Sequence, residues 1–92
     1  MSVKVISYDL GQPESSSSYK NLIAYIKGLG SWAKPLESYW LVDTDESCAS
    51  IRDGAKSYLD DNDELLVIPS SLSGWASYNL SPKVIDWLKR HR

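Results

Sequence analysis

Asp9 is the residue of this sequence that is best placed to do chemistry. Residues 3–10 (VKVISYDL) form a short apolar and β-branched run that Gly11 and Pro13 close, which predicts a strand ending near Tyr8 and Asp9. The end of a central strand is rigid backbone, so it can aim a carboxylate at a cleft. Asp9 can instead form an Asx-type turn before Gly11 or cap a nearby amide, and the residues alone favour this structural role.

Other familiar catalytic patterns are absent from the sequence. It has no Gly-rich phosphate-binding loop and no pair of cysteines with zinc spacing. The single histidine, His91, would have to serve any Ser-His triad from beside the C-terminus, and we do not expect one. The run DDNDE (60–64) lacks the spaced ligands and the glycine of a calcium-binding loop, so it indicates a solvated turn.

The segment after the first strand predicts an amphipathic helix. Its apolar residues recur three or four positions apart. They are Tyr19, Leu22, Ile23, Ile26 and Leu29. The hydroxyl of Ser17 or Ser18 can cap the first free amides, and Gly28 or Gly30 can end the helix in a left-handed conformation.

The central block predicts two strands, a second helix and a further strand. The strands cover residues 32–36 and 39–44, and Pro35 requires an edge or a bend in the first of them. A helix follows, capped by Thr44, Asp45 or Ser47. Its helical spacing is carried by Cys48, Ile51, Ala55, Tyr58 and Leu59. Residues 64–68 are short and aliphatic and are stopped by Pro69, as in a buried strand.

This order of elements predicts an α+β fold, the ferredoxin-like βαββαβ sandwich with an added C-terminal helix. We expect a single domain over residues 1–92, with a core over about 3–68 and a C-terminal extension over 69–92. In the extension, Ser81 caps a helix that begins at Pro82 and docks through Val84, Ile85 and Leu88.

Two helices on one sheet face would leave the other face to water. Six large aromatic residues then need a place, either in a thickened core or on a dimer face. They are Trp32, Tyr39, Trp40, Trp75, Tyr78 and Trp87.

Composition sets the remaining bounds. Ninety-two residues, 42% of them hydrophobic, suffice for one small core. The net charge of -2 argues against a broad electrostatic nucleic-acid binder, although a local basic patch stays open. Cys48 is the only cysteine and cannot form an intramolecular disulfide, and neither a signal peptide nor a membrane-length apolar run is expected. We therefore expect a soluble cytoplasmic protein with no membrane partner.

Two motifs resemble a known family. The first-strand motif KVISYDL (4–10) and the later motif KPLESYWLV (34–42), with the helix between them, resemble the small ferredoxin-like nucleases of the CRISPR adaptation machinery and their VapD-type interferase relatives. More narrowly, the chain resembles the SinR-like proteins. Tyr8, Asp9 and Leu10 match the end of the family's first strand, and Ser38 matches a family serine that precedes apolar strand residues. The resemblance covers about residues 3–68.

The resemblance implies a homodimer in which the Asp9 carboxylates of two subunits share a divalent cation, Mg²⁺ or Mn²⁺, while Tyr8 and Ser38 complete the catalytic site. The implied activity is a metal-dependent endoribonuclease, with RNA rather than DNA as the nucleic acid. Two departures favour an alternative, a non-catalytic dimeric scaffold or interaction module. The loop before the first helix carries only Lys20 as a basic residue, and residues 82–91 have helical spacing where the family often has a strand.

Overall fold

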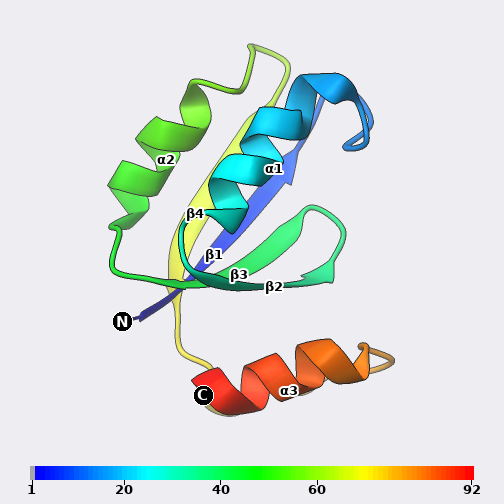
Figure 1. The fold of residues 1–92 in the computed structure, drawn as a ribbon, viewed down its shortest axis with the longest axis vertical. Helices are drawn as coiled ribbons and strands as arrows, with labels where there is room; N and C mark the ends of the chain where they lie inside the picture. Colours follow the sequence, from blue (N-terminus) through cyan, green and yellow to red (C-terminus); the bar gives the residue numbers. More distant parts are fainter. Residues whose placement is uncertain (1) are drawn as a thin grey trace.

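The chain contains four strands and three α-helices among residues 2–92. The computed structural model describes residues 2–92 and shows an α+β fold (Figure 1). Its elements are β1 (Ser2–Asp9), the short 3-10 helix η1 (Ser17–Tyr19), α1 (Lys20–Lys27), β2 (Ser31–Leu36), β3 (Tyr39–Thr44), α2 (Cys48–Lys56), β4 (Glu64–Ser70) and α3 (Pro82–His91). The strands and helices predicted from the sequence are all present, with bounds shifted by a few residues.

The four strands form one antiparallel sheet in the order β2-β3-β1-β4. The first strand is therefore central, between β3 and β4. Val5 lies opposite Leu41 on β3 and opposite Ile68 on β4. Because side chains alternate along a strand, Val3, Val5, Ser7 and Asp9 share one face of the sheet.

The helices α1 and α2 cover the first face of the sheet, where Ile6, Trp40 and Val42 are fully or almost fully buried (Figure 1). Leu22 and Ile26 of α1 and Ile51 of α2 close this core. Gly54 lets the two helices approach, because a Cβ at this position would lie 2.1 Å from the Tyr25 hydroxyl oxygen. A larger residue here would displace the end of the Tyr25 side chain, so this glycine leaves room for Tyr25 between the helices.

The second face is partly covered by the C-terminal segment. Leu72, Trp87 and Leu88 pack against Val3, Val5, Ala33 and Leu41 in a second apolar core. Val84 and Ile85 pack at its margin. The expectation that this face is left to water is therefore wrong for its β2 side and holds for the β4 side, where Leu66 and Ile68 are 61% and 43% exposed.

Polar contacts fix the position of α3 along β2. The Trp87 indole Nε1 donates a hydrogen bond to Ser31 Oγ at 2.9 Å. His91 stacks on Trp87, with ring centroids 3.9 Å apart, and its Nε2 lies 3.7 Å from a carboxylate oxygen of Asp43 on β3. His91 Nδ1 also lies 2.8 Å from the carbonyl oxygen of Trp87, so this histidine is part of the docking of α3.

Helix ends follow the predicted chemistry with two corrections. Ser47 and Ser81 cap α2 and α3, as predicted. Ser16, rather than Ser17 or Ser18, caps the short helix before α1. Gly28 ends α1 with a φ of -81°, so the predicted left-handed conformation is wrong. Gly30 is required for another reason, since a Cβ there would lie 2.2 Å from the carbonyl oxygen of Asp43.

The two edge strands tolerate their prolines. The pairing of β2 with β3 shifts register between Ala33 and Leu36, and Pro35 lies within this irregular stretch, in agreement with the predicted edge or bend. Pro69 lies in β4, the other edge strand, so β4 continues to Ser70 instead of stopping before the proline.

Truncating one buried side chain of α3 tests its docking. Leu88→Ala removes an almost fully buried side chain from the second core and should lower the free energy of unfolding by about 2–5 kcal/mol. Lys89→Ala, at the next and exposed position of the same helix, is the control and should change it by less than about 0.5 kcal/mol. Urea unfolding measures both values, and equal midpoints would show that α3 adds nothing to the fold.

Candidate functional site

Asp9 lies exposed at the end of β1, on the sheet face that α3 leaves open near β4. Its backbone partner on β4 is Glu64, directly opposite. Directly opposed residues of an antiparallel pair place their Cβ atoms about 4.5–5.5 Å apart on one face, so the two carboxylates are neighbours. Together with Ser7 and Leu66 they line a shallow depression.

The carboxylate of Asp9 accepts no hydrogen bond from any of residues 2–92. The Gly11 amide, the donor expected for an Asx-type turn at Asp9, donates to Asp63 Oδ1 at 2.9 Å instead. The same Asp63 oxygen accepts from the Tyr19 hydroxyl at 2.7 Å, and these bonds lower the pKa of Asp63, the one from Gly11 most. Asp63, and not Asp9, is thus the residue that shapes the loop.

Tyr8 points to the opposite face of the sheet, beneath the helices. Its buried hydroxyl donates to Glu14 Oε2 at 2.6 Å and accepts from Trp40 Nε1 at 2.7 Å. Burial, and then the hydrogen bond to Glu14, raise the pKa of this phenol well above its ordinary value. Tyr8 is therefore a neutral hydrogen-bonding group at neutral pH.

Glu14, which sequence reasoning did not single out, joins the first loop to β2. It forms an ion pair with Lys34 and accepts the Tyr8 hydrogen bond. Burial raises the pKa of Glu14, but the hydrogen bonds from Lys34, Tyr8 and the Ser38 backbone outweigh it, and the pKa is lowered. Little in the sequence singles out Glu14, because it is the only carboxylate in the Ser-rich loop QPESSSS.

Ser38 contributes through its backbone. It lies in the two-residue turn between β2 and β3 with a φ of 57°, in the left-handed region. Its carbonyl oxygen accepts a hydrogen bond from the Tyr8 amide at 3.2 Å. The turn is thus attached to the end of the central strand.

The three residues named from the sequence therefore meet at one end of the sheet, but not on one face. Tyr8 and Asp9 are consecutive in β1, so their side chains diverge. Asp9 alone presents a free functional group to solvent, next to Glu64. Tyr8 and Ser38 are connected to Asp9 only through the backbone, and their part in a site stays a prediction.

The acidic residues at this corner are the potential metal ligands of the site. Residues 2–92 contain no group of three or more His, Cys, Asp or Glu side chains placed to hold a metal ion. Asp9 and Glu64 are hard carboxylate ligands of the kind that Mg²⁺ and Mn²⁺ prefer, so the donor chemistry of this pair fits the cation.

Comparison with known proteins does not assign the chain to a family. No protein-family model matches the sequence, and no curated protein matches it. Among residues 2–92, none of the helices has the length and apolar content needed to cross a membrane.

The lowered pKa of Glu14 predicts an acid-sensitive contribution to stability. A carboxyl group whose pKa falls on folding stabilises the fold above its unfolded pKa, near 4.5, and this contribution is lost as the pH falls through the lower folded value. Glu14→Gln should therefore be less stable than the wild type at neutral pH, and the difference should shrink below pH 4.5. Urea unfolding between about pH 7 and pH 3 measures it.

Glu37→Gln makes the same charge change at an exposed position of the β2–β3 turn and serves as the control. A wild-type minus Glu14→Gln difference that stays constant with pH would show that the Glu14 contacts add no pH-dependent stability.

Proposed function

We propose that the fold is ferredoxin-like and that the protein forms a homodimer through the open part of the second sheet face. The element order βαββαβ and the sheet order β2-β3-β1-β4, with β1 antiparallel to both neighbours, support the fold. Leu66 and Ile68 support the interface, because two large aliphatic side chains exposed side by side on one face of β4 favour burial against a second copy.

Such an interface would bring the acidic corners of two subunits together. Each chain would present Asp9 and Glu64 at the margin of the apolar patch. Like charges held close are costly, and a divalent cation offsets that cost. When bound, the cation would supply charge neutralisation at a phosphodiester and a more acidic water. Asp9 would hold it, and Glu64 of the same chain would add a second carboxylate.

On this basis we propose a metal-dependent endoribonuclease that resembles the CRISPR-associated and SinR-like proteins, working in the reducing cytoplasm, where the single Cys48 needs no partner. The observation that carries the proposal is the exposed Asp9 carboxylate, which has no hydrogen bond within residues 2–92 and lies beside Glu64 on the uncovered face. A structural aspartate would be expected to satisfy its oxygens locally, as Asp63 does.

A non-catalytic dimeric scaffold is the second candidate. It is favoured by Tyr8 and Ser38, whose hydrogen bonds lie within the fold and do not bring their side chains to Asp9. The two candidates share the dimer and differ in the metal response.

The dimer is tested with one exposed leucine. Leu66→Glu places a charge in the middle of the proposed interface and should convert a dimer into a monomer, because burying an unpaired charge is costly. Leu36→Glu, at a similarly exposed leucine on the opposite edge strand, is the control and should stay dimeric. Light scattering at micromolar concentration gives the masses, and a monomeric wild type contradicts the proposal.

The metal site is tested by removing one charge. Mg²⁺ or Mn²⁺ should raise the melting temperature of the wild type progressively with metal concentration. At a metal concentration of about 100 times the Kd, the free energy of unfolding should increase by about 2.7 kcal/mol. Asp9→Asn should abolish this response together with any RNA cleavage, while Asp61→Asn in the exposed turn before β4 should preserve it. A metal response with no cleavage of single-stranded RNA would favour the scaffold, and identical responses in wild type and Asp9→Asn would refute the metal site.

A further inference from the structure

A basic groove follows the edge strand β2. It has a volume of about 540 Å³ and lies between the end of α1 and one side of α3. Among residues 2–92, four cationic side chains line it and no acidic residue does. The cations are Lys27 from α1, Lys34 from β2, and Lys83 and Arg90 from α3. The chain has a net charge of -2, so the groove is a local region of positive charge on an acidic protein.

Three of the cations are available for a ligand. Lys34 is already paired with Glu14. Among residues 2–92, no carboxylate lies within ion-pair distance of Lys27, Lys83 or Arg90, and all three side chains belong to exposed residues. The positive charges of these three side chains are therefore not neutralised by ion pairs within residues 2–92.

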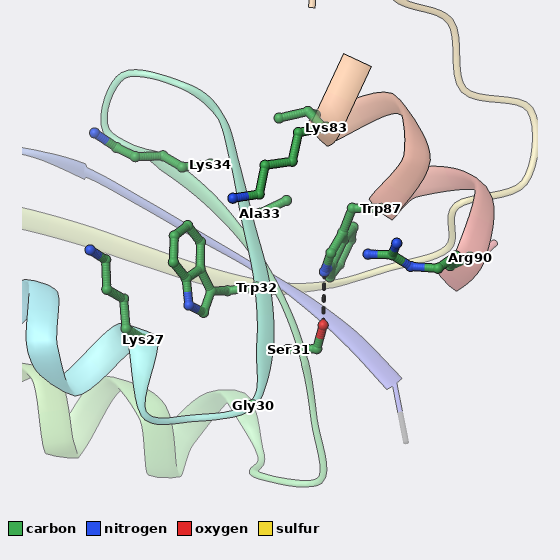
Figure 2. A pocket seen from close by; sticks show the side chains of 10 residues that line it. Lys27, Gly30, Ser31, Trp32, Ala33, Lys34, Lys83, Trp87 and Arg90 are labelled. Atoms are coloured by element: carbon green, nitrogen blue, oxygen red, sulfur yellow. Dashed lines mark hydrogen bonds between the residues drawn. The ribbon is translucent and has the colours of Figure 1, made fainter. Parts of the chain in front are cut away.

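An indole ring lies among these cations. Trp32 is 39% exposed although it is one of the largest side chains in the protein. Its ring packs edge-on against Trp40 at a centroid distance of 5.2 Å, and the Lys27 ammonium lies 5.1 Å from its centroid. Figure 2 shows Trp32 and Lys27 on one side of the β2 backbone and Trp87 and Arg90 on the other side, with the Lys83 side chain reaching from α3 toward β2. The ring is thus fixed in place and still open to a ligand.

We propose that this groove binds single-stranded nucleic acid. An exposed, fixed aromatic ring flanked by cations is the arrangement that stacks a base and neutralises the adjoining phosphates. Base stacking is stronger than an exposed cation–π contact, so an incoming base can displace the Lys27 ammonium from the ring toward a phosphate. The groove volume is within the range of small-ligand pockets, roughly 300–1,000 Å³, which suits an unstacked nucleotide and not a duplex.

The main competing occupant is an acidic peptide that adds a strand to β2. Strand addition requires a regular row of free amides and carbonyls along the edge. Pro35 removes one donor, and the pairing of β2 is irregular between Ala33 and Leu36. This edge is therefore poorly suited to a peptide strand, whereas a stacked base needs only the ring and the cations.

The groove extends the proposed nuclease function, because it would hold the RNA substrate. Only the role of the bound strand as a substrate rests on that proposed function. Binding requires neither Asp9 nor a metal, since Asp9 lies at the end of the central strand and does not line the groove. The two proposals can therefore fail separately.

Binding is measured by fluorescence anisotropy of a labelled oligouridylate of about ten nucleotides, in EDTA, with the full chain. Wild type should bind it more tightly than it binds the matching duplex or an oligoglutamate peptide. With three phosphates neutralised, the logarithm of the binding constant should fall with the logarithm of salt concentration with a slope of about -2. Tighter binding of the peptide, or no binding of the oligonucleotide at low salt, would overturn the inference.

Matched variants locate the site. Lys83→Ala with Arg90→Ala should weaken binding at least tenfold and reduce the slope by about 1.4, whereas Arg52→Ala with Lys56→Ala, which removes the same charges from exposed positions of α2, should leave both unchanged. Trp32→Leu should also weaken binding about tenfold, and Trp32→Phe should retain most of it. Equal affinities for the groove and α2 variants would overturn the site.

Asp9→Asn separates the two proposals. It should bind the oligouridylate in EDTA as tightly as the wild type. Binding by both proteins, with no cleavage by the wild type when Mg²⁺ is added, would refute the nuclease and support the groove. If the groove variants bind and cleave RNA as well as the wild type does, the binding site in the groove is refuted and the nuclease proposal is not.

Discussion

The rest of the structure depends on the burial of β1 on both faces. Val3 and Val5 pack under the C-terminal segment, while Ile6 and Tyr8 pack under α1 and α2. Because side chains alternate along a strand, a slip of one residue would exchange the two sets and destroy both cores. This requirement fixes the face on which each residue of β1 lies and so places Asp9 at the open corner beside Glu64. It also sends Tyr8 to the other face, where Trp40 and Glu14 hold its hydroxyl.

Local patterns in the sequence were sufficient to predict the elements, because strands and helices are set by periodicity and capping. Ser47 and Ser81 cap the helices where expected, and Pro35 lies at an irregular edge. Some errors are local, such as the capping serine before α1, but the larger ones come from contacts between distant segments. Gly30 is needed because the carbonyl of Asp43 passes close to it, and no pattern in residues 28–30 could reveal that contact. The partial covering of the second face likewise depends on where residues 72–88 dock.

In the candidate sites, too, the sequence indicates single residues but not the contacts between distant segments. Asp9 was identified from its place at a strand end, but its freedom from hydrogen bonds follows from Asp63, which reaches back from the loop before β4 to bond Gly11. In the basic groove, Lys83, Trp87 and Arg90 are spaced four and three residues apart, a helical stripe that the sequence displays. Their meeting with Lys27 and Trp32 depends on the docking of α3 along β2, which periodicity cannot predict.

The central place of β1 has a consequence for how the protein folds during synthesis. Its neighbour β3 follows soon after α1, but its other neighbour, β4, emerges only after both helices. Until then β1 is an edge strand with an unpaired row of backbone groups and apolar side chains on both faces. Contacts between segments far apart in sequence form slowly, so the pairing of β4 with β1 is the step that removes this exposed edge.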